Sequence, residues 1–180
     1  ETITIAGHEL QSALTAMLGK KIESGMNLDG SHTIIIGSRA SLSQEILKAI
    51  DADYDLINDE GYIIKTVAIN NNRHIVITGK KDVGVLYGVY NFLRLIQTHQ
   101  PIEKLNIADA PKINNRILNH WDNLDRTVER GYAGFSLWNW QKLPDFIDQR
   151  YIDYARANAS IGINGTVLTN VNANALILTP

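Results

Sequence analysis

The sequence predicts an α/β protein in two parts: a layered α/β domain over residues 1–100 and a βαβ unit over residues 116–180, joined by a linker at residues 101–115. In the first part, short β-branched runs alternate with amphipathic helical patterns, which is typical of layered α/β domains. All four prolines lie at or after Pro101, and all three tryptophans lie between Trp121 and Trp140. This uneven distribution indicates two regions of different character.

The first half of the N-terminal part predicts two strands and two helices. Thr2 to Ile5 is β-rich and predicts a short strand, and a helix with a stop at Gly19 follows it, with apolar residues at helical spacing: Leu10, Ala13, Leu14, Met17 and Leu18. Thr33 to Ile36 predicts a buried strand that ends at Gly37. Ser41 and Gln44 have the spacing of a capping box, which predicts a second helix over the apolar residues Leu42, Ile46, Leu47 and Ile50.

A hairpin and a third helix complete the domain. Gly61 to Ile69 and His74 to Thr78 are β-branched runs, and the asparagines 70–72 between them tolerate the left-handed backbone of a tight turn. Asp82 is placed to cap a helix from Val83 to about Gln97, which carries one broad apolar side. The linker between Pro101 and Pro111 contains one short extended piece.

The second part has the order strand, helix, strand. Arg116 to Trp121 and Ile163 to Val171 are the predicted strands, and Tyr151 to Ser160 is the helix between them. A (β/α)₈ barrel takes about 250 residues, so this chain has room for only the first two strands of one. We therefore expect the start of a truncated barrel.

Composition and motifs exclude several classes of function. The formal charge is −2, from 17 Lys and Arg against 19 Asp and Glu, which gives no broad field for nucleic acid or an anionic membrane. The chain has no Cys, no apolar run of roughly 18 residues, and none of the common nucleotide-binding or nucleophile-elbow motifs. Its five histidines do not have metal-site spacing, so we expect no metal and no cofactor.

The stretch NHWDNLDRTVERGYAGFSLWNW, from Asn119 to Trp140, mixes amides, acids and large aromatic residues after the first barrel-like strand. In a parallel barrel, this end of the strands forms the active-site face. Aromatic faces stack on sugar rings, and carboxylates and amides bind hydroxyls, so the composition suits carbohydrate. The alternative is structural: Trp138 and Trp140 as core anchors, and Glu129 with Arg130 as a surface ion pair. A second polar run, from Asn170 to Asn174, follows the second strand and is either a loop or part of the same site.

NHWDNLDRTVERGYAGFSLWNW, followed by YARANASIGINGTVLTNVNAN from Tyr154 to Asn174, closely resembles glycoside hydrolase family 67, the microbial xylan α-glucuronidases. The upstream DVGVLYGVYNFLRLIQT, from Asp82 to Thr98, resembles the last helix of that family's N-terminal domain. The resemblance implies an N-terminal α/β domain like that of β-N-acetylhexosaminidases, then a catalytic (β/α)₈ barrel, and in the parent a C-terminal dimerisation region. It also implies an inverting hydrolase that removes 4-O-methyl-D-glucuronic acid α-1,2-linked to xylose in glucuronoxylan-derived xylo-oligosaccharides.

The resemblance assigns part of the uronic-acid pocket. Trp121, in NHWDN, and Val171, in NVNA, resemble the residues that line the apolar sheath around the sugar's 4-O-methyl group, and a methyl ether is best met by apolar surface. Further candidates for hydroxyl contacts or for support of the pocket are Asp122, Asn123, Glu129, Arg130, Asn170 and Asn172. In the family the catalytic carboxylates come from later barrel strands, so the acid and base are expected beyond Pro180.

Two alternatives stay open. The chain could be a non-catalytic α/β module that binds a glycan or a protein, or the N-terminal domain of another barrel glycosidase, although NHWDN and NVNA do not fit the latter. The chain begins at Glu1 and ends at Pro180 after the apolar run from Ala175 to Leu178, so we expect a fragment that is inactive alone. The compartment of the parent is undetermined, with periplasm or exterior favoured over cytoplasm.

Overall fold

The computed structural model describes residues 1–26, 32–123 and 125–168. The chain forms two compact units, Glu1–Lys112 and Ile113–Pro180, and each is described by itself. Both α-helices and β-strands occur in each unit, so the protein is of the mixed α/β class. In the described part of the chain, no helix has the length and apolar character needed to cross a membrane.

The first unit is built on a four-stranded sheet in the order β1-β3-β2-β4. Strands β2 (Tyr62–Ile69) and β3 (Asn72–Gly79) form the predicted antiparallel hairpin. Strand β1 (Ile34–Ser38) pairs parallel to β3, and β4 (Asn106–Asp109) pairs antiparallel to β2. Strand β4 is the extended piece expected in the linker range 101–115, and its pairing makes it part of this sheet.

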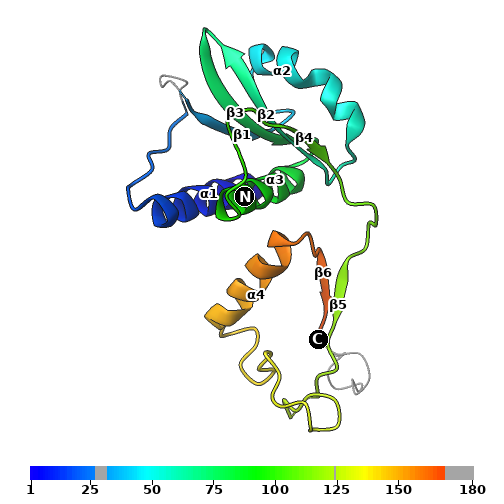
Figure 1. The fold of residues 1–180 in the computed structure, drawn as a ribbon. Coiled ribbons are helices and arrows are strands. Elements are labelled where there is room, and N and C mark those ends of the chain that lie inside the picture. Colours follow the sequence, from blue (N-terminus) through cyan, green and yellow to red (C-terminus); the bar gives the residue numbers. More distant parts are fainter. Residues whose placement is uncertain (27–31, 124, 169–180) are drawn as a thin grey trace. The chain divides into compact units, whose positions relative to one another are not determined.

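Helices cover both faces of the sheet (Figure 1). On one face lie α1 (Thr2–Leu18) and α3 (Asp82–Gln97), and on the other lie α2 (Gln44–Ile50) and the 3₁₀ helix η1 (Asp51–Leu56). Because side chains alternate along a strand, Ile64 and Ile77 pack toward α1 and α3, whereas Ile63 and Val76 pack toward α2. The unit therefore has two apolar layers around one sheet.

The first helix contradicts the sequence prediction of a strand at Thr2 to Ile5. Residues 2–5 are the first turn of α1, because the helical apolar pattern extends backward from Leu14 and Leu10 to the fully buried Ala6. Burial of this face outweighs the strand preference of the β-branched Thr2, Ile3, Thr4 and Ile5. The predicted end at Gly19 is confirmed, and this residue has the left-handed backbone of a C-cap, with φ 64°.

Two predicted helix caps are wrong. Ser43, not Ser41, caps α2 by accepting a hydrogen bond from the backbone N–H of Ile46, while the Ser41 hydroxyl donates to the carbonyl of Ser38. Asp82 is the first residue of α3, and Lys81 occupies the cap position. From the first turn of α3, the carboxylate of Asp82 still interacts favourably with the positive end of the helix dipole.

A glycine brings α3 close to the sheet. A Cβ atom at Gly84 would collide with the carbonyl oxygen of Gly61, so only glycine allows this approach of the two backbones. The buried face of α3 then includes Val85, Val89 and Phe92, each at most 1% exposed.

The second unit contains β5 (Ile117–Asn119), α4 (Gln149–Ser160) and β6 (Gly165–Val167). Strands β5 and β6 pair in parallel, from Ile117 opposite Gly165 to Asn119 opposite Val167. The predicted strand–helix–strand order is confirmed, although both strands are shorter than expected within the described residues. The parallel pair has a defined carboxyl end, and the motif residues follow it.

Candidate functional site

The sequence motif begins where β5 ends. Asn119 is the last paired residue of β5, and the backbone N–H of His120 donates to the carbonyl of Val167 at 2.9 Å. Trp121, Asp122 and Asn123 therefore lie directly beyond the carboxyl end of the β5–β6 pair, as the sequence predicts. In parallel α/β folds this is the end at which ligands bind.

The residues after the strand form a small antiparallel meander of three segments, residues 121–123, 127–129 and 134–136. Asp122 bridges Val128, and Thr127 bridges Phe135. The backbone N–H of Glu129 donates to the carbonyl of Trp121 at 2.7 Å, which ties the first segment to the second. Paired segments hold the loop's backbone in one geometry.

Trp121 and Asp122 point to different surroundings. The Trp121 side chain is 47% exposed, whereas Asp122 is only 3% exposed. The buried carboxylate of Asp122 accepts a hydrogen bond from the hydroxyl of Ser136, and this hydroxyl accepts one from the backbone N–H of Trp138 at 2.8 Å. Asp122 is thus engaged in holding the loop, whereas the indole of Trp121 is exposed to solvent.

An aromatic cluster supports the same loop from α4. Trp138 is 8% exposed and packs against Tyr151 and Tyr154 of α4, with ring centroids 4.9 and 5.5 Å away. The ring of His120 makes edge contacts with Trp138 and Tyr154. The structural alternative for Trp138, a core anchor, is therefore the correct one.

His120 is hydrogen bonded to the helix. Its Nε2 shares a hydrogen bond of 2.6 Å with the hydroxyl of Tyr154, which also lies 3.3 Å from the hydroxyl of Thr166 on β6. Its Nδ1 lies 4.0 Å from the carboxylate of Asp122, beyond hydrogen-bond range. A chain of polar contacts thus runs from β6 through α4 to the end of β5.

Asn123 and Glu129 shape the turns of the meander. The side-chain amide of Asn123 donates to the hydroxyl of Thr127 and to the carbonyl of Glu129, both at 2.7 Å. Glu129 has a positive φ of 57° and is half-buried, and its carboxylate accepts a hydrogen bond from Tyr132, which raises the pKa of this tyrosine. Arg130 is exposed. Asn123 therefore supports the loop, and its amide protons are committed to that task.

The remaining predicted residues, Asn170, Val171 and Asn172, lie outside the described residues. Sequence reasoning missed Ser136, Tyr151 and Tyr154 as supporting residues. Tyr151 and Tyr154 are three positions apart on a helix, so they share one face, and this spacing was the available signal.

Among the residues that the structure describes, no group of three or more His, Asp or Glu is arranged to hold a metal ion.

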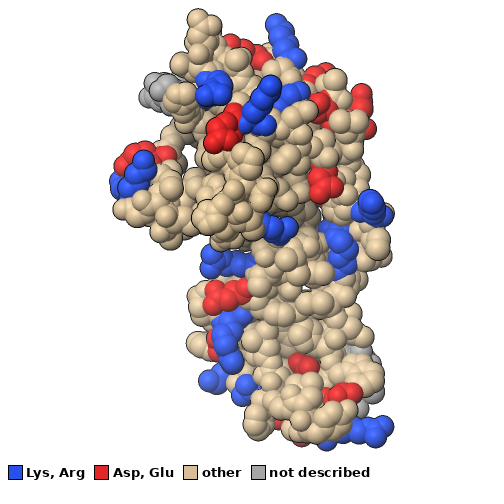
Figure 2. All heavy atoms as spheres, in the orientation of Figure 1, with Lys and Arg blue, Asp and Glu red and all other residues tan. Residues whose placement is uncertain are grey.

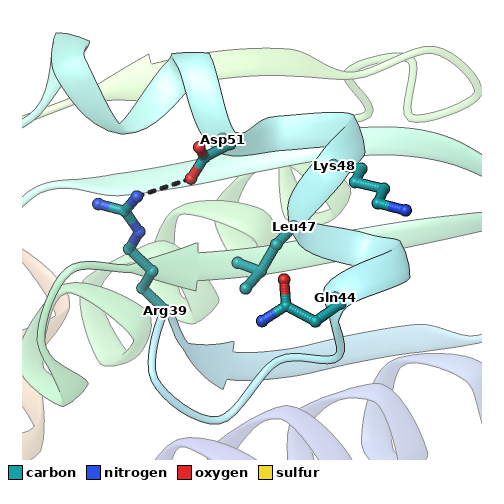
Figure 3. A pocket seen from close by; sticks show the side chains of 5 residues that line it. All are labelled: Arg39, Gln44, Leu47, Lys48 and Asp51. Carbon is teal, nitrogen blue, oxygen red and sulfur yellow. Dashed lines mark hydrogen bonds and ion pairs between the residues drawn. The ribbon is translucent and has the colours of Figure 1, made fainter.

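A surface pocket in the first unit lies apart from the motif residues in sequence. It has a volume of about 370 Å³ and is lined by Arg39, Gln44, Leu47, Lys48 and Asp51. Arg39 and Asp51 form an ion pair of 2.7 Å across it (Figure 3). The side chains of Arg39 and Asp51 are both about half exposed. Figure 2 shows acidic and basic side chains interspersed over one face of the protein. The lining of this shallow pocket has two basic residues and one acidic residue, and none of its five residues is a buried polar group of the kind expected of a specific site.

Comparison with solved structures supports the α/β fold. A glycoside hydrolase described as a "GH138 enzyme targeting pectin rhamnogalacturonan II" aligns with 94% of this chain at a TM-score of 0.62 and 18% identity, over 22% of its own length. A protein described as a "novel family GH115 4-O-Methyl-alpha-glucuronidase" aligns with 92% at a TM-score of 0.59 and 14% identity, over 23% of its length. At these identities the likeness concerns the fold alone.

Sequence comparison is more specific. The protein named "Probable alpha-glucuronidase A" from Aspergillus terreus is 33% identical over 179 residues, which is 96% of this chain and 20% of the relative. Its namesake from Neosartorya fischeri is 32% identical over 99% of the chain. The chain spans about one fifth of the length of these curated relatives.

Two family models match the chain consecutively. Residues 1–92 match the N-terminus of glycosyl hydrolase family 67, and residues 95–180 match the middle domain of the same family. The two matches follow each other in the order in which the family arranges them and leave only residues 93 and 94 between them. The chain belongs to glycosyl hydrolase family 67.

Proposed function

We propose that this chain is the N-terminal part of an inverting α-glucuronidase, which removes 4-O-methyl-D-glucuronic acid α-1,2-linked to xylose in xylo-oligosaccharides from glucuronoxylan. The observation that carries the proposal is the consecutive match of both family 67 models over residues 1–92 and 95–180. The site geometry agrees with it, because an exposed indole stands at the carboxyl end of a parallel strand pair.

The two units have different roles in this proposal. Residues 1–100, together with β4 from the range 101–115, form a non-catalytic domain of the β-N-acetylhexosaminidase N-terminal type. Residues 116–180 supply the first strand–helix–strand part of a (β/α)₈ barrel. The parallel pairing of β5 with β6 through α4 supports this assignment, since such a unit is the repeating element of a barrel.

The uronic acid binds against Trp121 and Val171, with the apolar surface of both facing the 4-O-methyl group. Asp122 and Asn123 support this pocket rather than contact the sugar, because their side chains are engaged with Ser136 and with Thr127 and Glu129. Glu129, Arg130, Asn170 and Asn172 are the candidates for contacts with sugar hydroxyls and the carboxylate.

The chemistry needs groups from later parts of the parent. Inversion requires a general acid that protonates the leaving oxygen and a carboxylate base that activates water, roughly 6.5 to 9.5 Å apart. We place both on later barrel strands, beyond residue 180, and we place the parent's dimer contacts in its C-terminal region. The 180-residue chain alone is therefore expected to be inactive.

The test compares the full-length parent with the 180-residue chain on aldobiouronic and aldotriouronic acids, with release of 4-O-methylglucuronic acid as the readout. Activity in the parent and none in the chain is the expected result. A folded parent without activity would overturn the proposal in favour of a binding module. An active 180-residue chain would show that the acid and base have been misplaced.

A matched pair of variants in the parent tests the pocket. Trp121→Ala should raise the KM for the methylated substrate, because it removes the apolar wall. Phe135→Ala removes an aromatic residue that is 81% exposed on the same meander, and it should leave KM unchanged. Equal effects of the two variants would contradict the assignment of Trp121.

A further inference from the structure

We propose that His120 and Tyr154 are a positioning pair that fixes Trp121 against the sugar, and that their hydrogen bond helps to set the preference for methylated glucuronic acid. This inference rests on the proposed function, because it assigns a role within the same pocket. It concerns two side chains that need not touch the substrate.

The argument starts from the alternation of side chains along β5 and its continuation. In an extended backbone, neighbouring side chains point to opposite faces. His120 and Asp122 both turn toward the side packed by α4 and Trp138, and their side chains are only 22% and 3% exposed. Trp121, between them, turns to the other side and is 47% exposed. The residue proposed to contact the sugar is thus flanked by two anchored residues.

The anchor on the carboxyl side of Trp121 belongs to the meander. Asp122 accepts the hydroxyl hydrogen bond of Ser136 and bridges Val128, and the carbonyl of Trp121 accepts the N–H of Glu129 at 2.7 Å. All of these partners lie within residues 121–136. They fix the shape of the loop, and the loop meets the helix further along the chain, where Trp138 packs on Tyr151 and Tyr154.

The anchor on the amino side of Trp121 is His120, and it connects the loop to α4. The hydrogen bond between His120 Nε2 and the Tyr154 hydroxyl spans 34 residues of sequence, and the Tyr154 ring stacks edge-on against both His120 and Trp138. Tyr154 also reaches Thr166 on β6 at 3.3 Å. The Tyr154 hydroxyl therefore links α4 to β6 and, through His120, to the residue that precedes Trp121.

Loss of the hydrogen bond between His120 and Tyr154 should affect substrate binding rather than the chemical step. The proposed acid and base lie elsewhere in the parent, so their geometry does not depend on Tyr154. A displaced indole, however, would lose apolar contact with the 4-O-methyl group, and the binding energy of such a contact follows the apolar area that it buries. We therefore expect a change in KM and in selectivity with kcat preserved.

The experiment uses the full-length parent and four variants. Tyr154→Phe removes the hydroxyl and keeps the ring. Tyr151→Phe is the matched control, because Tyr151 lies on the same helix, packs on the same Trp138 and loses an equivalent hydroxyl hydrogen bond, the one that it accepts from the backbone N–H of Asn139 at 2.8 Å. His120→Gln retains a side-chain donor that can reach the Tyr154 hydroxyl, so it should be milder than His120→Leu.

The readouts are kcat and KM on the methylated and unmethylated aldotriouronic acids, with the melting temperature of each variant measured in parallel. For Tyr154→Phe we expect a rise of about fivefold in KM for the methylated substrate, the equivalent of one neutral hydrogen bond. We expect its preference for the methylated substrate to fall by up to about fourfold, the contribution of one buried methyl group. Tyr151→Phe should lower the melting temperature and leave the preference intact.

The outcomes separate the two proposals. An active parent in which both tyrosine variants change KM and preference equally would overturn the positioning role and leave the proposed function standing. A drop in kcat at unchanged KM in Tyr154→Phe would also overturn it. A folded parent that hydrolyses neither substrate would overturn the proposed function and the inference together. If Tyr154→Phe does not fold, His120→Gln against His120→Leu gives the same comparison.

Discussion

Leu105 provides a sharp test of where the first domain ends. It lies within residues 101–115, the range that the sequence predicts as a linker, and in an exposed linker its replacement by alanine would change stability by at most about 0.5 kcal/mol. In the structure, Leu105 is 7% exposed and belongs to the apolar layer of α1 and α3. Its N–H donates to the Thr66 hydroxyl, and its carbonyl accepts from the Thr66 N–H, both at 2.9 Å.

The expected cost of Leu105→Ala is therefore that of a buried leucine, about 3 kcal/mol, within the range of about 2 to 5 kcal/mol for such changes. The assay is hydrogen exchange of the β3 amides in the 180-residue chain. About 3 kcal/mol corresponds to about a hundredfold faster exchange through unfolding. Ile113→Ala is the matched control, since Ile113 lies in the same range and is 66% exposed. Equal exchange in both variants would refute the placement of residues 101–109 in the first unit.

Three further predictions concern stability. Tyr54→Phe should destabilise the first unit by about 1 to 3 kcal/mol in urea unfolding, because it leaves the buried Thr78 hydroxyl without its 2.7 Å partner; no change would show that water replaces it. Burial, and then the carboxylate of Asp109, raise the pKa of Tyr62 in the folded state. The contribution of Tyr62 to stability is therefore complete below about pH 10 and is lost as the pH rises through the folded pKa. Tyr62→Phe should flatten this alkaline loss of stability, and an unchanged pH profile in the variant would contradict the assignment. Amides of the first unit should exchange more slowly than those of β5 and β6, whose two-stranded sheet leaves both edges unpaired among the described residues, and equal protection would oppose independent folding of residues 1–100.

The elements that the sequence predicts well are those with strong periodicity. The hairpin at β2 and β3, helix α3 and the order β5-α4-β6 follow from alternating or helical apolar patterns. The start of α1 does not, because four β-branched residues have the local preference of a strand and only the burial of Ala6 shows that the helix begins at Thr2. Tertiary packing decided that case against local propensity.

The candidate site divides in the same way. The sequence predicts that polar and aromatic residues follow β5, because they come directly after a predicted strand. It does not predict which of these residues are exposed, because the partners of Asp122 and His120 are Ser136 and Tyr154, 14 and 34 residues away. Such pairings depend on the path of the chain, so the sequence left open whether Asp122 contacts a sugar hydroxyl or supports the pocket.

The two ends of the β5–β6 pair are built differently, and the difference bears on function. At the amino end, Arg116 donates to the carbonyls of Gly162 and Ile113, and its own N–H donates to the Asn164 side chain, so the polar contacts there involve mainly the backbone. At the carboxyl end, the contacts run between side chains and leave one indole exposed. In parallel barrels the amino end carries stability and the carboxyl end carries the site. Replacing Arg116 should therefore lower the stability of the second unit without changing substrate preference, whereas replacing the exposed Trp121 should change the preference with little effect on stability.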